Sequence, residues 1–300
     1  MVKGEIKKID FRDQISSNKV RSVILLILVF LVFVALGLAI AFAFRLDMFV
    51  MLAFSTIFSI FYVWITYAFS DKIALASVGA QKADPIRHKP LYDSVENMSI
   101  ASGMPMPQVY IMPGAQINAF ATGKNPEKSV ICVTEGALQK LNKQELEGVI
   151  GHEMSHIANY DIKFVTIVAV VVGAISIFSQ IFLRSLWFRG GNHDDRGGGN
   201  VIFFLIALAL AIIAPIIVKL VQLAISRKRE YMADAGSVAF TRYPPGLINA
   251  LNKIKKDHEP LQVPGAVAPM FFSDTTKQRF AELFQTHPDI NKRISAIESM

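Results

Sequence analysis

Cysteine is almost absent from this chain, since Cys132 is the only one in 300 residues. A single cysteine excludes an internal disulfide and a cysteine-based zinc site. Its neighbours in the run SVICVT indicate a buried strand residue rather than a nucleophile. Charge is scarce as well, with 18% charged residues against 52% hydrophobic ones. This balance is not typical of a soluble globular domain.

The apolar residues are gathered in four long blocks rather than spread at helical or strand period. Each block is about 20 residues long, which is enough to cross a bilayer. The blocks are Val23–Phe44, Met48–Phe69, Phe164–Leu183 and Val201–Ile225. The first is too long for the apolar core of a signal peptide, and no small-residue cleavage site follows it, so we interpret it as a retained anchor. We therefore expect a multi-pass membrane protein, with the lipid bilayer as a partner.

Lysine and arginine near the blocks predict the orientation. The net charge is +7, and such residues mark the cytoplasmic flanks of membrane proteins, so nucleic acid is not an expected partner. The N-terminus is basic, and the fourth block ends at Arg227-Lys228-Arg229. These flanks and blocks predict five parts. Residues 1–22 are a cytoplasmic N-terminus, 23–69 a transmembrane hairpin and 164–225 a second transmembrane pair, and residues 70–163 and 226–300 are the first and second parts of a soluble domain. The second pair either spans the bilayer or forms a re-entrant pair, and both leave an even number of crossings.

The two polar segments predict a small sheet and several helices. The expected strands are Gln108–Met112, Gln116–Thr122 and Ser129–Thr134, separated by turn-forming residues. A helix should begin near Pro90, and the capping-box pattern from Asn142 to Glu145 should begin another. Further helices are expected at Arg229–Phe240, Gly246–Lys256, Lys277–Phe284 and Ile290–Ile297.

The run His152-Glu153-Met154-Ser155-His156 lies on the helix that the capping box begins. Positions i and i+4 lie on one helix face, so the two histidines can share one zinc ion. Glu153 is one step round the helix, close enough to hold a metal-bound water but poorly placed as a ligand. A carboxylate beside a zinc-bound water is the arrangement of a metal hydrolase.

A third protein ligand must come from elsewhere. His193 with Asp194-Asp195 is predicted on the opposite side of the membrane, and Asp161 follows His156 too closely to complete a tetrahedron easily. Glu230 returns to the same side after two blocks. Glu230 and Asp234 are at positions i and i+4, so they lie on one helix face. Glu230 can therefore bind zinc while Asp234 orients a ligand histidine through the second nitrogen of the imidazole ring. On spacing alone, a solvated acidic pair beside the basic stop signal remains an equal alternative.

With these pieces assembled, the chain resembles the HtpX family of membrane zinc metalloproteases. The resemblance covers nearly the whole chain and rests on GHEMSH and EYMADAGS, together with INAFATG at 117–123 and THPDINKR at 286–293. It implies an α+β membrane protein with four transmembrane helices and a zincin-like metalloprotease domain, built from a small sheet and an active-site helix. It also implies one Zn²⁺ per subunit, bound by His152, His156 and Glu230. The chain departs from many relatives at Ile117 and Asp289, neither of which is a proposed catalytic residue.

The two additional stretches have physical interpretations of their own. INAFATG alternates and is bounded by turns, so it can form an edge strand that pairs with an extended substrate. Asn118, Ala119 and Phe120 are then the expected substrate-binding residues; the alternative is an ordinary sheet edge. His287 and Arg293 are a turn and a half of helix apart and can stabilise the oxyanion of a tetrahedral intermediate. A capping or structural pair is the alternative for them.

The predicted function is a zinc endopeptidase of the cell (inner) membrane with its active site on the cytoplasmic side. The resemblance implies that it cleaves misfolded or damaged membrane proteins, as protein quality control under envelope stress. Glu153 is its general base, and proteins or peptides are its substrates. One alternative is a CaaX-type prenyl endopeptidase, which should have more spans. The other is a zinc-binding membrane protein without enzymatic activity, such as a transporter; the four blocks carry almost no ionisable residues, which argues against a transport path. The sequence does not predict the oligomeric state.

Overall fold

The computed structural model describes residues 11–44, 46–171, 227–257, 270–272 and 288–300. Several predicted features lie outside these residues: the third block beyond Val171, the fourth block, the loop with His193, the helix Lys277–Phe284 and His287.

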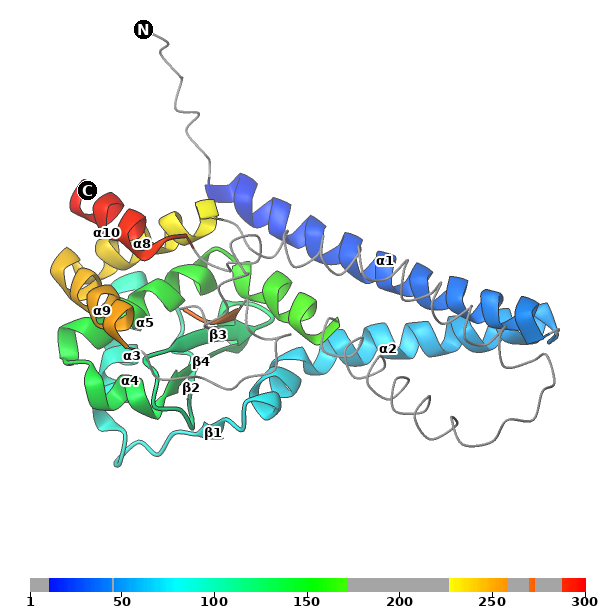
Figure 1. Cartoon of the computed structure of the whole chain (residues 1–300), viewed down its shortest axis with the longest axis horizontal. Coiled ribbons are helices and arrows are strands. Elements are labelled where there is room, and N and C mark those ends of the chain that lie inside the picture. The colour runs from blue at the N-terminus through cyan, green and yellow to red at the C-terminus, as the bar shows by residue number, and fades with distance from the viewer. Residues whose placement is uncertain (1–10, 45, 172–226, 258–269, 273–287) are drawn as a thin grey trace, which may run out of the picture.

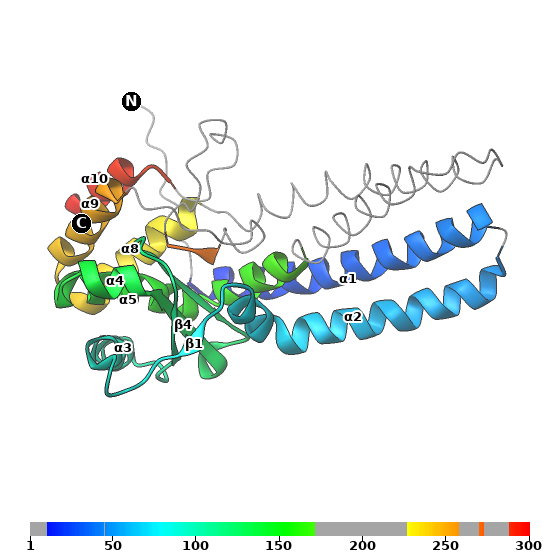
Figure 2. The ribbon, with the colours of Figure 1, turned by 60° about the horizontal axis from the view of Figure 1, so that its bottom comes forward.

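A helical hairpin extends away from a domain that contains the sheet (Figures 1 and 2). It consists of α1 (Phe11–Phe44) and α2 (Met48–Ser77), and Asp47 caps α2 by accepting a hydrogen bond from the Val50 N–H at 2.8 Å. Both helices extend past the predicted apolar blocks, because a helix makes its hydrogen bonds within its own backbone and does not need apolar side chains to continue.

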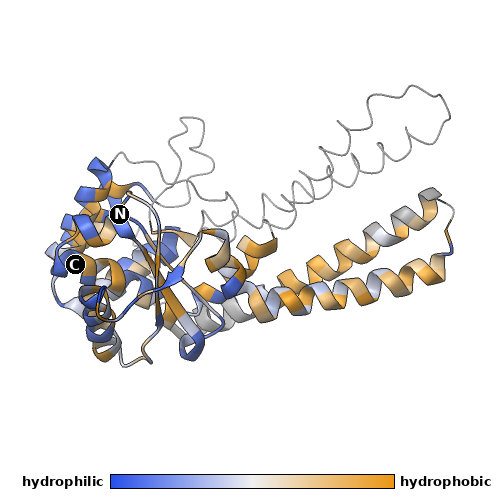
Figure 3. Ribbon diagram, turned by 90° about the horizontal axis from the view of Figure 1, so that it is seen from below, coloured by the Kyte–Doolittle hydropathy of each residue, from blue (hydrophilic) through white to orange (hydrophobic). Residues whose placement is uncertain are grey.

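The residues of α2 are predominantly apolar (Figure 3), and many of their large side chains are exposed. Large side chains such as Phe49 and Ile57 are exposed by 84% and 69%. In the described part of the chain, α2 alone is long and apolar enough to cross a membrane as a single straight helix. An exposed apolar surface of this kind marks contact with lipid or another protein. The four predicted spans as a set stay a prediction.

The sheet has four strands in the order β1-β2-β4-β3. They are β1 (Gln81–Lys82), β2 (Gln108–Met112), β3 (Ala119–Gly123) and β4 (Ser129–Thr134). The pair β2–β4 is parallel and the other two pairs are antiparallel. Every residue of β4 is buried, and burial raises the pKa of the Cys132 thiol, which fits a core residue rather than a nucleophile.

The bounds of β2 and β4 are those expected from the sequence, but β3 starts later than the predicted Gln116. The reason is that side chains take the preceding backbone N–H groups. Asp257 accepts from the Ile117 N–H at 2.7 Å, and Thr134 Oγ1 accepts from the Asn118 N–H at 3.0 Å. These two N–H groups are therefore not available for pairing with a neighbouring strand.

Helices cover both faces of the sheet. On one face lie α3 (Lys89–Ser102), α5 (Lys143–Ala158) and α9 (Pro244–Lys256), which share a core with Val109, Ile131 and Val133. Next to α5 and α9 pack α8 (Arg227–Thr241) and α10 (Ile290–Glu298). The other face, with Cys132, contacts Leu75 of α2 and Ala169. The predicted helices in the described ranges are present, whereas β1 and the short helix α4 (Glu135–Lys140) were not predicted.

The helix after α5 leaves at a sharp angle. Residues Asp161–Val171 form a second helix bent by 88° from α5, and Tyr160 at the break has a φ of 58°. This second helix packs on α1, where Phe164 and Val168 meet Leu25. The active-site helix therefore does not continue straight into the third apolar block, because one left-handed residue redirects the chain.

Candidate metal centre

His152 and His156 lie one turn apart on α5, and the start of that helix is firmly determined. The Asn142 side chain accepts from the Glu145 N–H at 2.9 Å, and Glu145 accepts from the Asn142 N–H at 2.8 Å, so the predicted capping box is present. Lys253 pairs with the same glutamate at 2.6 Å. The two histidines direct their Nε2 atoms toward each other, 3.1 Å apart.

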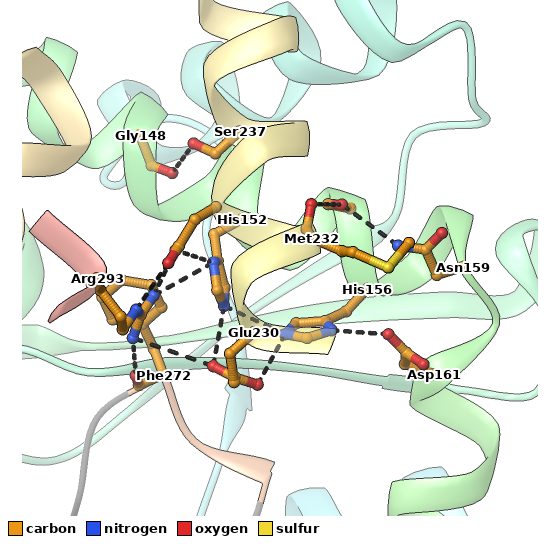
Figure 4. Close-up of polar contacts among 12 residues, drawn as sticks. Gly148, His152, His156, Asn159, Asp161, Glu230, Met232, Ser237, Phe272 and Arg293 are labelled. Carbon is orange, nitrogen blue, oxygen red and sulfur yellow. Dashed lines mark hydrogen bonds and ion pairs between the residues drawn. The ribbon is translucent and has the colours of Figure 1, made fainter. Parts of the chain in front are cut away.

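Glu230, in the first turn of α8, completes the cluster (Figure 4). Its Oε2 lies 3.6 Å from Nε2 of His152, and its Oε1 lies 3.5 Å from Nε2 of His156. One donor atom from each of the three side chains lies within 4.8 Å of the others. Two neutral imidazoles and a carboxylate are a ligand set for a divalent transition metal.

Small residues let α5 and α8 approach closely enough for this cluster. A Cβ on Gly236 would lie 2.7 Å from the Cβ of Ser155, too close for an undisturbed contact. Beside it, the Ser237 hydroxyl donates to the Gly148 carbonyl at 2.6 Å (Figure 4). Ser237, Gly236 and Gly148 therefore determine the spacing between the histidines on α5 and Glu230 on α8.

Asp234 contacts the other ring nitrogen of His152. Its Oδ1 lies 2.9 Å from Nδ1, and Arg293 donates to both carboxylate oxygens, from Nε at 2.9 Å and from Nη2 at 2.7 Å. Burial raises the pKa of Asp234, but the charge of Arg293 and the bond to His152 outweigh it and lower the pKa to about 2. An ionised Asp234 holds the proton on Nδ1, which leaves Nε2 free to bind a metal.

Asp161 contacts His156 in the same way, at 3.0 Å between Oδ2 and Nδ1 (Figure 4). Burial lowers the pKa of His156, but hydrogen bonds to Asp161 and Glu230 outweigh it and raise the pKa to about 10. Sequence reasoning considered Asp161 only as a ligand and missed this contact. The signal available was its position just beyond the end of the histidine helix.

Arg293 lies behind His152 and is 1% exposed. Besides Asp234, it donates from Nη1 to the Phe272 carbonyl at 3.4 Å, and its guanidinium lies 4.7 Å from the centre of the Phe272 ring. Burial lowers the pKa of Arg293, but the carboxylates of Asp234, Glu230 and Glu153 outweigh it and raise the pKa. Its predicted partner in oxyanion stabilisation, His287, lies outside the described residues, and the pairing stays a prediction.

The predicted substrate strand is buried and partly covered. Asn118 is 0% exposed, and its Oδ1 accepts from the Ala119 N–H at 3.0 Å. The Ala119 carbonyl accepts from the Phe272 N–H at 2.8 Å, and Phe120 pairs with Phe271 in an antiparallel bridge. A substrate strand at this edge would have to replace these contacts with Phe271 and Phe272.

The family model described as Peptidase family M48 matches residues 85–300, which contain all the proposed ligands. The chain belongs to the HtpX family of M48 peptidases. It is 46% identical to a protease HtpX homolog of Caldanaerobacter subterraneus, over 82% of this chain and 84% of the relative. A second such homolog, from Ligilactobacillus salivarius, is 38% identical over 96% of this chain and 99% of its own length.

A solved structure is also similar. It is the crystal structure of S. mikatae Ste24p, at 18% identity with a TM-score of 0.48, and it covers 95% of this chain. The chain spans 66% of the length of that protein. Membership of the M48 family makes the chain a metalloprotease, and the cluster of His152, His156 and Glu230 is where its metal would bind.

Proposed function

We propose that the chain is a zinc endopeptidase of the cell (inner) membrane with its active site at the cytoplasmic surface. The observation that carries this proposal is the convergence of His152, His156 and Glu230 beside Glu153. Two of these groups come from α5 and one from α8, so the folded domain is needed to assemble them.

The donor set fits zinc. A tetrahedral zinc with donors at about 2.0–2.1 Å separates its donor atoms by roughly 3.4 Å. The two Nε2 atoms lie 3.1 Å apart, and each has a Glu230 oxygen at a similar distance, Oε2 at 3.6 Å from His152 and Oε1 at 3.5 Å from His156. When bound, zinc supplies a Lewis acid that polarises the scissile carbonyl and lowers the pKa of a coordinated water to about 7.

Glu153 would act as the general base. It follows His152 directly on α5 and is 2% exposed, which supports a position for its carboxylate next to the ligands. It would take a proton from the attacking water and pass it to the leaving amine nitrogen. Asp234 would keep His152 in the tautomer that presents Nε2 to the metal.

Substrates would be extended polypeptides. We propose that their backbone pairs with β3 beside Ala119 and takes over the hydrogen bond that Phe272 makes there. Misfolded or damaged membrane proteins are the proposed natural substrates, in protein quality control. The exposed apolar surface of α2 supports an enzyme held in the bilayer where such substrates are found.

Residues at the domain end of α2 support the proposed orientation. The Lys163 and Lys124 ammonium groups lie 4.9 and 5.9 Å from the ring centre of Tyr67. Aromatic and basic residues gather at the membrane interface, and the basic side is the cytoplasmic one. The domain with the metal ligands lies at this end of the hairpin (Figure 1).

The test replaces Glu153 by Gln and measures bound zinc and casein cleavage separately in the purified protein. We expect zinc content to stay near one per chain while cleavage falls by about 10²–10⁴-fold, because the general base is lost. Glu147→Gln is the matched control: this glutamate lies on the same helix but accepts a hydrogen bond from Asn97 at 2.8 Å. Full cleavage by Glu153→Gln would falsify the proposal.

The same assay separates the alternatives. A prenyl endopeptidase would cleave a prenylated CaaX peptide in preference to casein. A zinc-binding protein without activity would bind zinc and cleave neither.

A further inference from the structure

Each ligand histidine is backed by a carboxylate, and that carboxylate pairs with an arginine from a distant part of the chain. His152 has Asp234 and Arg293, as the site geometry shows. His156 has Asp161, whose Oδ1 lies 3.5 Å from Nη1 of Arg229. The sequence predicted that Asp234 orients a ligand histidine, but it predicted neither Asp161 nor the two arginines in these positions.

We propose that Asp161, held by Arg229, is the positioning residue for His156 and ties this metal ligand to the helices that lead toward the membrane. The inference rests on the proposed role of His156 as a ligand and extends it to two further residues.

The contact determines which nitrogen of His156 is available. Asp161 meets Nδ1 at 3.0 Å, and Nε2 then faces Glu230 at 3.5 Å (Figure 4). A carboxylate on Nδ1 selects the tautomer that carries its proton there and also restricts rotation of the ring. Loss of the Asp161 carboxylate would remove this restraint on the ring and let Nε2 turn away from Glu230.

Burial argues that the pair is more than a surface contact. Asp161 is 2% exposed and Arg229 is 5% exposed. Removing two charges from water costs free energy that their attraction does not reliably return, so an ion pair at this depth is weak evidence for stability alone. An orienting function for the carboxylate gives a physical reason for its presence.

Both residues lie where the domain meets the apolar helices. Asp161 is the first residue of the helix Asp161–Val171, which leaves α5 at 88°. The carboxylate is favoured there by the partial positive charge of the helix N-terminus. The Arg229 guanidinium lies 5.8 Å from the ring centre of Phe164, on the same helix. Arg229 therefore contacts this helix through both an ion pair and an aromatic ring.

The same helix packs on the hairpin. Phe164, Ile167 and Val168 form a buried cluster with Leu25 and Val29 of α1. The position of Asp161 therefore depends on how α1 packs against this helix. His152, in contrast, is held through Arg293 from α10 within the domain. The two ligand histidines are thus positioned from two different sides.

The experiment compares Asp161→Ala and Asp161→Asn in the full chain. Zinc affinity is measured by competition with a chelator, and kcat and KM at saturating zinc. We expect Asp161→Ala to bind zinc about 10–100-fold more weakly. Asp161→Asn keeps an acceptor oxygen for Nδ1–H and should recover part of this loss. Asp93→Asn, at an exposed pair with Lys89, is the control and should leave zinc affinity unchanged.

A second comparison tests Arg229. Arg229→Lys loses the planar donor set and should weaken zinc binding, whereas Arg227→Lys, at an exposed position of the same helix turn, should not. The visible absorption of bound Co²⁺ reports the ligand geometry directly. It should change in the Asp161 variants and stay the same in both controls.

The inference is overturned if folded Asp161→Ala binds zinc within twofold of the unchanged chain and gives the same Co²⁺ spectrum. If Asp161→Ala does not fold, the inference is tested by the nearly isosteric Asp161→Asn and by Arg229→Lys with its control Arg227→Lys. The same limits on zinc affinity and on the Co²⁺ spectrum apply. A lower melting temperature with unchanged zinc affinity indicates a purely structural pair and also overturns it. Failure of the unchanged chain to bind zinc would instead contradict the proposed function.

Discussion

Arg293 donates two hydrogen bonds to Asp234, from Nε at 2.9 Å and from Nη2 at 2.7 Å, and both side chains are buried behind His152. The sequence suggested that Arg293 stabilises an oxyanion. Its geometry places it next to the carboxylate that orients a metal ligand. These two roles predict different effects on zinc affinity and on kcat.

Arg293→Lys keeps the charge but loses the planar fork that fits a carboxylate. If Arg293 acts through Asp234, zinc affinity should fall by about 10-fold or more, while kcat at saturating zinc changes little. If it stabilises the oxyanion, kcat should fall by about 10²–10³-fold with zinc affinity unchanged. We expect the first result. Arg87→Lys, at an exposed position, is the control and should match the unchanged chain in both measurements.

The close approach of α5 and α8 predicts that Gly236 tolerates no side chain. Gly236→Ala would place a Cβ 2.7 Å from the Cβ of Ser155, so the helices must move apart. We expect the free energy of unfolding to fall by about 1–3 kcal/mol and zinc affinity to fall with it. Thermal unfolding in detergent and chelator competition would measure both effects.

The control for Gly236→Ala is Ser155→Gly, made alone and in combination with Gly236→Ala. The single change should lower stability by about 1 kcal/mol, since glycine is unfavourable within a helix. In the double variant the contact is gone, so zinc affinity should recover. A Gly236→Ala variant as stable as the unchanged chain would show that the helices are not in tight contact here.

Metal affinity should depend on pH through His156, whose pKa is raised to about 10. Below that pH the imidazole of the metal-free protein carries a proton that a metal must displace. Apparent zinc affinity should therefore fall by about tenfold for each pH unit between 9 and 7. Chelator competition across this range, corrected for the titration of the chelator, would measure it. An affinity that does not change with pH would contradict the assignment.

The same shift has a consequence for the metal-free fold. Because the pKa of His156 is higher in the folded state than in the unfolded state, protonation of this histidine stabilises the fold. The contribution is complete below about pH 6.5. This contribution is lost as the pH rises through about 10. Unfolding of the metal-free protein at several pH values would detect it.

Local patterns in the sequence were sufficient to predict several parts of this protein. The capping box at Asn142 and the spacing of His152 and His156 predict one helix with two ligands on one face, because both depend on residues within a few turns. The strands β2 and β4 follow from short apolar runs between turns. The grouping of Glu230 with the histidines followed from counting the predicted crossings and from the family resemblance.

Other features depend on contacts between distant residues, and no local pattern encodes them. β3 starts at Ala119 because Asp257 and Thr134 occupy the preceding N–H groups. The edge of that strand is covered by Phe271 and Phe272, far along the chain.

The sequence by itself determined the chemistry of the site: two histidines and an adjacent glutamate on one helix. Only the tertiary structure decided how the ligands are held. Side chains from α8, α10 and the helix after the bend, among them Asp161 and Arg293, orient the histidines from behind. The physical reason is that ring orientation depends on a hydrogen bond to the second nitrogen. Its partner is selected by helix packing rather than by sequence spacing.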